Sequence, residues 1–192
     1  MGLHILWINE IANFTGGCER YIADTATLLK KWHGVHNTLL YGIDEKTDVH
    51  FMKLFDYAFP KVDIERQIAQ IEPDIVYIHR LTGIDQLESV LSCGRPVMRF
   101  YHDHKLFCLR EHKYTAIGHK TCTRPVGPYC YPCLGFINRA DTPLKVRLST
   151  TGSFKREIRA NHRLDGFVVG SDYMAGHLEL HGFDTSKIHV DP

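Results

Sequence analysis

Four cysteines lie close together in the middle of the sequence, and their spacing points to a metal site or a redox pair as candidates. Two of them form a C-x-x-C pair, Cys130-Tyr131-Pro132-Cys133, and Cys108 and Cys122 precede it. Four thiolates suit tetrahedral Zn²⁺, which would tie an otherwise irregular segment together. The irregular spacing of the first two leaves a thioredoxin-like redox pair and four unrelated reduced thiols as alternatives. A histidine could also replace one thiolate, and the candidates are His102, His104, His112 and His119.

A pair of adjacent glycines, Gly16-Gly17, follows an apolar segment and precedes a helical pattern. In α/β proteins phosphates bind at this place, because glycines let the backbone approach closely and a helix N-terminus offers unpaired N–H groups. The alternative is a tight turn without a ligand. The G-x-G-x-x-G fingerprint is absent, which disfavours a nicotinamide or flavin site, although Asp44 stands roughly where a ribose-binding acid would follow the second strand.

Polar and titratable side chains follow three of the apolar segments, at the point where each segment ends. The carboxyl ends of parallel strands border the ligand crevice of an open sheet, so the convergence of several such groups favours a binding site. A single histidine in this position is more often a structural, hydrogen-bonding residue. The residues concerned are Asn9, Glu10, His79, Arg80, His102, Asp103 and His104.

Hydrophobic periodicity predicts the elements that would position these residues. Apolar runs alternate with helical patterns, which is typical of an α/β fold with a Rossmann-like, doubly wound, mostly parallel sheet. A chain of 192 residues with 44% hydrophobic content favours a single domain over residues 1–192. The predicted strands are 4–9, 36–41, 74–79, 97–101, 166–170 and 187–190, and the predicted helices are 18–33, 62–71, 84–91, 143–163 and 172–181.

A Cys-rich loop of about residues 102–141 interrupts this rhythm as an insertion. A loop of that length is uncommon unless it is functional or internally tied. The predicted helix that follows has inward positions at Leu144, Leu148, Phe154 and Ile158 and a basic outward face of Lys155, Arg156, Arg159 and Arg163. Such a face could contact phosphates or the surface of a membrane, but a solvated face is more common. The remaining cysteines, Cys18 and Cys93, are expected to be small core residues.

The charge balance and the chain's start limit the classes of partner. Lys plus Arg total 23 and Asp plus Glu total 22, so no overall field attracts nucleic acid. The first residues lack a signal peptide, Leu6 breaks the myristoylation pattern, and no apolar run is long enough to span a bilayer. We therefore expect a cytoplasmic protein whose cysteines form no disulfide framework.

With these residues placed, the sequence resembles the N-terminal, acceptor-side domain of glycosyltransferase family 4, whose members belong to the GT-B class of two facing Rossmann-like domains. The resemblance covers essentially the whole chain and includes the Cys-rich loop, which a subset of that family also carries. The motifs that carry it, in order, are Gly16-Gly17-Cys18-Glu19-Arg20, Pro73-Asp74-Ile75-Val76-Tyr77-Ile78-His79, Tyr101-His102-Asp103 and Phe167-Val168-Val169-Gly170-Ser171.

The resemblance implies a retaining glycosyltransferase, of hexosyltransferase type, that uses a nucleotide-sugar donor and no catalytic metal. It implies that Gly16 and Gly17 approach the donor diphosphate and that His102 contacts the donor sugar near the reacting carbon. The acceptor, which would be a sugar or a lipid-linked molecule, would be bound mainly by this domain, for which we expect the residues Glu10, His79, Arg80, Asp103 and His104.

The family's second domain, which supplies the nucleotide pocket, is absent from this sequence. The chain ends at Pro192, where the interdomain linker would begin, so we expect the C-terminal donor domain in a longer version of the same chain or in a partner chain, and the isolated chain to be inactive. The alternative is a zinc-stapled Rossmann-like binding module without catalysis of its own. An NAD(P)-dependent oxidoreductase is disfavoured by the missing third glycine.

Overall fold

Seven parallel strands form one sheet in a computed structural model of the protein, which describes residues 2–43, 46–116, 118–139, 146–148 and 150–192. The strand order is β3-β2-β1-β4-β5-β8-β9. This confirms the predicted Rossmann-like α/β class. The strands are β1 (His4–Asn9), β2 (His36–Tyr41), β3 (Tyr57–Pro60), β4 (Ile75–Ile78), β5 (Val97–Tyr101), β8 (Gly166–Val169) and β9 (Ile188–Val190).

Helices connect these strands, and a separate two-stranded antiparallel pair is formed by β6 (Ile137–Arg139) and β7 (Val146–Leu148). The α-helices are α1 (Gly17–His33), α2 (Val49–Met52), α3 (Ile64–Ile71), α4 (Ile84–Leu91), α5 (Thr151–Asn161) and α6 (Asp172–Leu180), and the 3-10 helices are η1 (Pro128–Cys130) and η2 (Thr185–Lys187).

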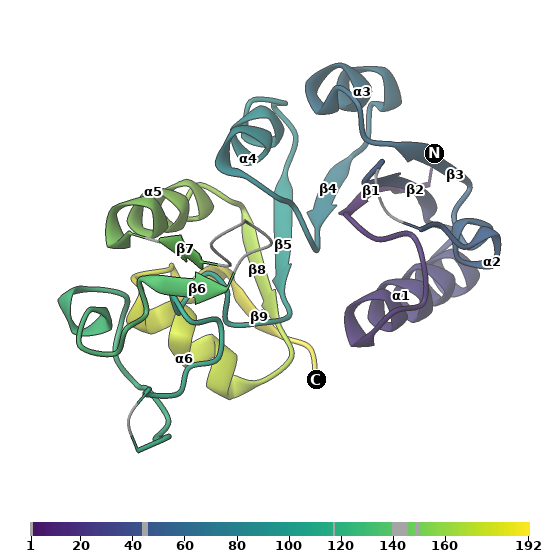
Figure 1. Cartoon of the computed structure of the whole chain (residues 1–192). Helices are drawn as coiled ribbons and strands as arrows, with labels where there is room; N and C mark the ends of the chain where they lie inside the picture. Colours follow the sequence, from purple (N-terminus) through teal and green to yellow (C-terminus); the bar gives the residue numbers. More distant parts are fainter. Residues whose placement is uncertain (1, 44–45, 117, 140–145, 149) are drawn as a thin grey trace. The chain divides into compact units, whose positions relative to one another are not determined.

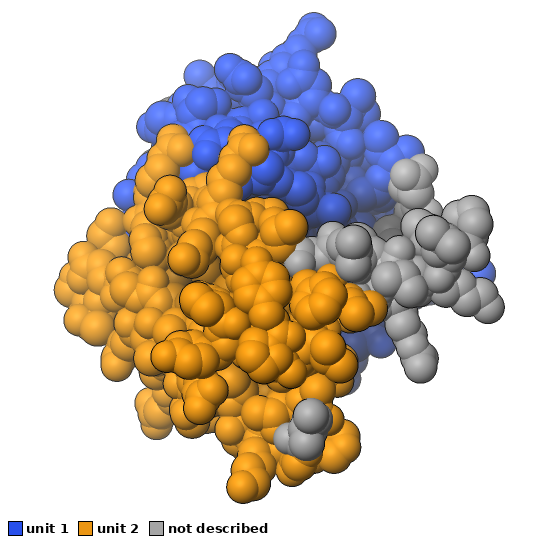
Figure 2. All heavy atoms as spheres, turned by 60° about the vertical axis from the view of Figure 1, so that its left-hand side comes forward, with its two compact units in different colours: residues 1–100, 164–166 blue, residues 101–163, 167–192 orange. Residues whose placement is uncertain are grey.

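The chain divides into two compact units, coloured separately in Figure 2. Unit 1 comprises residues 1–100 and 164–166, and unit 2 comprises residues 101–163 and 167–192. Each predicted site residue therefore belongs to one unit or the other. Glu10, the glycine pair, His79 and Arg80 lie in unit 1, whereas the His102 segment and the Cys-rich loop lie in unit 2.

Unit 1 is doubly wound, with α1 on one side of its strands and α3 and α4 on the other (Figure 1). Its centre is β1, which pairs in parallel with β2 on one side and with β4 on the other. A central parallel strand is covered on both faces, and accordingly Leu6, Trp7 and Ile8 are all fully buried. These buried residues form the core of unit 1, which holds the ends of its strands in place.

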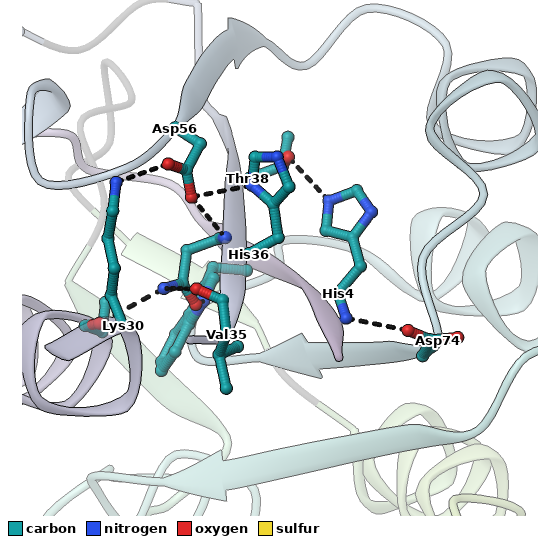
Figure 3. Close-up of polar contacts among 10 residues, drawn as sticks. His4, Lys30, Val35, His36, Thr38, Asp56 and Asp74 are labelled. Atoms are coloured by element: carbon teal, nitrogen blue, oxygen red, sulfur yellow. Dashed lines mark hydrogen bonds and ion pairs between the residues drawn. The ribbon is translucent and has the colours of Figure 1, made fainter. Parts of the chain in front are cut away.

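Asp56 joins α1, β2 and β3 at the amino ends of the unit 1 strands (Figure 3). Its carboxylate accepts hydrogen bonds from the backbone N–H of Asn37 at 2.8 Å, from His36 Nδ1 at 2.8 Å, and from the ammonium group of Lys30. Burial acts to raise the pKa of Asp56, but these donors outweigh it and lower the pKa to about 2. The ionised carboxylate is therefore part of the folded structure.

Unit 2 has an aromatic core beneath α6. Phe107, Phe167 and Phe183 are all buried, with the rings of Phe167 and Phe183 4.9 Å apart. Tyr101 donates a hydrogen bond from its hydroxyl to Asn161 Oδ1 at 3.0 Å, which fixes the end of α5. The Ser171 side chain caps α6, as predicted, by accepting from the backbone N–H of Met174.

The predicted helix over residues 143–163 is wrong in its first part. Residues Val146–Leu148 form β7, and α5 begins only after Thr150, whose side chain accepts from the backbone N–H of Ser153 at 3.3 Å. The apolar residues before and after this cap have a similar spacing, which is why the sequence predicts one continuous helix. Pairing with β6 makes residues Val146–Leu148 a strand instead. Pro143 and Leu144 lie outside the described residues. The outward basic face is confirmed for Lys155, Arg156 and Arg159, which are all exposed, whereas Arg163 is exposed but follows the end of α5.

The structure corrects the prediction for Cys93 and adds two short elements that the sequence did not predict. Cys93 is only half-buried, because it lies in the turn that ends α4, so it is not a core residue, whereas Cys18 is buried as expected. The periodicity did not predict α2 or β3, which are each only four residues long. Asp44 lies outside the described residues.

Candidate functional site

The glycine turn lies at the carboxyl end of β1 and opens α1. Gly16 is the N-cap of this helix, with extended backbone and no side-chain cap, and both glycines are exposed. A Cβ atom built on Gly17 would meet nothing within 4 Å, so the space in front of the first helical turn is open. A 17-residue helix presents its unpaired N–H groups and positive dipole end there, which suits an anion.

A buried carboxylate lies under this turn. Glu19, in the first turn of α1, has no exposed surface, and it accepts from the Thr15 hydroxyl at 3.1 Å and from Asn9 Nδ2 at 3.4 Å. Its Oε1 also lies 3.5 Å from Nη1 of Arg80, whose side chain is 40% exposed. The fixed carboxylate therefore orients a guanidinium group that still reaches solvent. Sequence reasoning gave Glu19 no role, although an acid in the first turn of a helix is a recognisable signal.

Glu10 is part of an internal network. Its Oε1 accepts from Lys61 Nζ at 2.5 Å and from the backbone N–H of Thr82 at 2.8 Å, and Lys61 also donates to Gln86 Oε1 at 2.7 Å. Lys61 is almost fully buried. The carboxylate thus ties the ends of β1 and β3 to α4, which stabilises the carboxyl edge of the unit 1 strands. Its predicted contact with an acceptor stays a prediction.

His79 directly follows β4, beside the end of β1, and its backbone N–H donates to the carbonyl of Ile8 at 2.9 Å. Only 3% of the residue is exposed. The imidazole stacks between Trp7, at a centroid distance of 5.4 Å, and Phe100, at 5.9 Å. The structure therefore places Glu10, the glycine turn, His79 and Arg80 at one edge of unit 1, where His79 is buried and Arg80 is more exposed.

Unit 2 holds the other predicted residues. His102 is half-buried, and the exposed Asp103 accepts from the backbone N–H of Lys105 at 2.9 Å. Burial lowers the pKa of His104, and Lys113 lowers it further, while Asp103 opposes the change. The roles of His102, Asp103 and His104 stay predictions.

His177 of α6 is a titratable residue that sequence reasoning missed. It is 4% exposed, and neither of its ring nitrogens has a hydrogen-bond partner in the part of the chain that the structure describes. Burial, Lys113, His104 and His181 together lower its pKa to about 4. The imidazole is therefore neutral at neutral pH. It occupies an ordinary inward helical position, so the pattern of the sequence did not set it apart.

All four cysteines of the Cys-rich loop line one cavity of about 290 Å³, together with Lys113. None of the four is in a disulfide. Burial raises the pKa of the Cys130 thiol, and the other three thiols of the cavity raise it further. A thioredoxin-like nucleophile needs a lowered thiol pKa and a helix directly after a strand, so the Cys130/Cys133 pair does not fit the redox alternative.

No protein-family model matches the sequence, and no curated protein matches it. Solved structures do match the fold, among them glycosyltransferases of the GT-B class. Within the described residues, no helix is both long enough and apolar enough to cross a membrane.

Three of these structures illustrate the likeness. Anabaena Alr3699/HepE in complex with UDP-glucose has a TM-score of 0.52 and 12% identity, over 98% of this chain and 43% of that chain. Phytolacca americana UGT2 complexed with UDP-2fluoro-glucose and pterostilbene has a TM-score of 0.56 and 12% identity, over 99% and 53%. A ugt transferase from Siraitia grosvenorii in complex with UDP has a TM-score of 0.54 and 9% identity, over 98% and 50%.

At these identities the likeness establishes the fold alone. The chain spans about half the length of the solved structures that it matches.

Proposed function

We propose that this chain is the acceptor-side half of a retaining glycosyltransferase of the GT-B class, similar to family 4, which transfers a sugar from a nucleotide-sugar donor. The main support is the exposed glycine turn at the N-terminus of α1, at the carboxyl end of the central strand, with open space in front of Gly17. The ligands named for two of the structural neighbours, UDP-glucose and UDP-2fluoro-glucose, are donors of this kind.

In this proposal the diphosphate of the donor lies against Gly16 and Gly17. Two oriented sources of positive potential would stabilise its charge: the N–H groups of the helix and the guanidinium of Arg80, which Glu19 holds in place. Phosphate charge increases on the leaving group as the sugar–phosphate bond breaks, so positive groups fixed there favour the transition state.

His102 has a positioning and electrostatic role beside the transferred sugar. Retention of configuration leaves no need for a dedicated general base among the residues of this half, and the reaction needs no catalytic metal. Glu10, His79, Arg80, Asp103 and His104 bind the acceptor, a sugar or a lipid-linked molecule. The donor half, in the same chain or in a partner chain, supplies the nucleotide pocket.

The substitution Gly17→Ala tests the diphosphate site directly. An alanine methyl group at position 17 meets no atom of the protein within 4 Å, so the fold tolerates it, but the methyl occupies the space that the phosphate needs. Alanine in the first turn also favours the helix. We expect Gly17→Ala to abolish the chemical-shift changes that UDP-glucose causes at α1 in NMR spectra of this chain, with stability unchanged or slightly raised.

Gly176→Ala is the matched control, because Gly176 is also helical and its Cβ position is also open. It should raise stability to a similar extent and leave the UDP-glucose shifts unchanged. If Gly17→Ala binds UDP-glucose as the wild type does, the diphosphate does not bind at the turn. If UDP-glucose causes no shift in the wild type at millimolar concentration, the turn does not bind the diphosphate in the absence of the donor half.

A further inference from the structure

The Cys-rich loop brings its four cysteines to one place, although they are spread from position 108 to position 133 in the sequence. These four residues line the same cavity as Lys113, and we call this cavity the cysteine pocket: Cys108, Cys122, Cys130 and Cys133. Each of the four is half-buried. Four thiols without a shared role are not expected to come together in a segment with little regular secondary structure. Their convergence therefore needs a physical cause.

The turn that carries Cys130 and Cys133 is closed by its own backbone. Cys130 donates its N–H to the Gly127 carbonyl at 3.0 Å, and its carbonyl accepts from the N–H of Gly135 at 3.0 Å. Leu134 has a positive φ of 56°, an uncommon conformation for a leucine. The backbone N–H of Ala116 points at Cys133 Sγ, 3.4 Å away. A strained turn that presents two sulfurs to one cavity, with an N–H directed at one of them, suits thiolates that are bound as ligands.

A small hairpin places the third sulfur. The N–H of Cys122 donates to the carbonyl of Lys113 at 2.7 Å, the N–H of Thr115 donates to the carbonyl of Lys120 at 2.9 Å, and Tyr114 pairs with Thr121. Cys122 therefore lies beside Lys113 at the base of the hairpin. The fourth sulfur is fixed by a turn in which the N–H of Glu111 donates to the Cys108 carbonyl at 2.8 Å. Glu111 and Lys113 also have positive φ, of 66° and 55°.

Lys113 is the unusual residue of this pocket. It is 2% exposed, and its ammonium group donates to the carbonyl of Arg124 at 2.7 Å. Among the residues that the structure describes, no carboxylate oxygen lies within 4.0 Å of it. A buried cation without an anion is unfavourable. The four thiols are the groups lining the same cavity that ionise most readily to an anion, since the other acidic groups there are the phenols of Tyr114 and Tyr129.

We propose that Cys108, Cys122, Cys130 and Cys133 bind one zinc ion as a tetrathiolate centre and that the buried Lys113 offsets part of the negative charge of this centre. In the binding step four thiols release four protons and form four Zn–S bonds, so that Zn²⁺ with four thiolates carries a net charge of two minus. The site is structural, because four protein ligands leave no open coordination position. It is independent of the sugar-nucleotide site.

The sulfur atoms of the cysteine pocket must move closer together to bind one zinc ion. No three of its sulfur atoms lie within 4.8 Å of one another in the described part of the chain. Zn–S bonds of about 2.3 Å require sulfurs about 3.8 Å apart, so the metal has to draw the side chains inward. The cavity of about 290 Å³ leaves room for this movement. Zinc binding should therefore tighten the loop as well as fill the site.

Metal analysis of the chain, purified without chelators, tests the proposal. We expect one zinc per chain in the wild type and in Cys93→Ser, a control whose thiol lies outside the pocket, and far less in Cys130→Ser and Cys133→Ser. Because a Cys→Ser chain could fail to fold, the wild-type protein is also stripped of metal and reconstituted with Co²⁺. Tetrahedral thiolate coordination then gives intense visible d–d absorption and a sulfur-to-cobalt charge-transfer band.

Lys113→Met tests the second part, with Lys155→Met as the control because Lys155 is an exposed lysine of α5 that does not line the cysteine pocket. Loss of a residue that supports metal ligands weakens affinity by about 10–100-fold, and we expect this for Lys113→Met and no change for Lys155→Met. The absence of zinc together with no cobalt spectrum would overturn the tetrathiolate centre. So would a metal whose amount is the same in the pocket variants, since it would be bound elsewhere. Equal zinc affinity in both lysine variants would overturn the role of Lys113.

Discussion

At the scale of single residues, a buried carboxylate lies beneath the glycine turn. Glu19 is fully buried at the positive end of α1 and engages Thr15, Asn9 and Arg80. A negative charge at a helix N-terminus is stabilised by the macrodipole, so Glu19 already offsets part of the potential that would attract a phosphate. The guanidinium of Arg80 supplies a second positive group at the same edge. A donor at this turn would therefore depend on the pair, not on the helix alone.

His177 makes stability depend on pH between about pH 6.5 and 4. Its pKa is lowered in the folded protein to about 4, so below pH 6.5 the unfolded chain binds more protons than the folded one. The free energy of unfolding should then fall by about 2 kcal/mol from pH 7 to pH 5 on account of this residue, at about 1.4 kcal/mol per pKa unit. Urea unfolding at the two pH values measures this loss.

The variant His177→Leu removes the titrating group and should show a smaller loss of stability between pH 7 and pH 5 than the wild type. His33→Gln, which changes an exposed histidine at the end of α1, should retain the full loss. His4, His104 and His181 also have lowered pKa values because of burial, so some loss remains in every variant. An unchanged difference in His177→Leu would show that His177 is protonated as easily in the folded state as in the unfolded state.

At the scale of elements, Asp56 connects the end of α1 to β2 and β3 (Figure 3). Its pKa of about 2 lies below the usual 3.8, so ionisation favours the folded state. The stabilisation is complete above about pH 4 and is lost as the pH falls through about 2. We expect Asp56→Ala to lower the free energy of unfolding by about 2 kcal/mol at pH 7, measured by urea denaturation.

Glu65→Ala is the control for Asp56→Ala, because Glu65 is an exposed acid in the first turn of α3. It should cost at most about 1 kcal/mol, through the helix dipole alone. The difference between the two variants should be much smaller at pH 2, where Asp56 is about half protonated in the folded protein. Equal stabilities at pH 7 would mean that the three donors around Asp56 contribute nothing beyond solvation.

At the scale of the whole molecule, the main fact is that the chain spans about half the length of the three solved structures described above. In the proposed function the catalytic site is complete only with a donor half. We expect His102→Ala, in the protein joined by that half, to lower kcat by about 10²–10³-fold, the usual cost of losing one group that stabilises the transition state. Stability of the chain should be unchanged, since His102 is only half-buried.

The measurement is the rate of sugar transfer from UDP-glucose to an added sugar or lipid-linked acceptor, with His50→Ala, an exposed histidine of unit 1, as the control. A rate for His102→Ala equal to the wild type would remove His102 from the site. UDP-glucose binding without any transfer by the joined protein would favour the binding-module alternative.

The sequence determined the order and type of most elements. Strands β1, β2 and β5 and helix α4 have the predicted bounds, because apolar residues mark the strands and Gly83 and Gly94 lie just outside the helix. It also determined that polar residues follow the strands and that four cysteines share one loop. These are local properties of the chain, so spacing alone reveals them.

Tertiary structure decided the rest. The short elements α2 and β3 and the strand β7 exist because of their partners, and no local period indicates a partner. The burial of Glu19, His177 and Lys113 likewise depends on segments distant in the sequence. The sequence does not show whether water or protein surrounds a polar residue. Only the folded chain shows which charges are buried, what they contact and how their pKa values change.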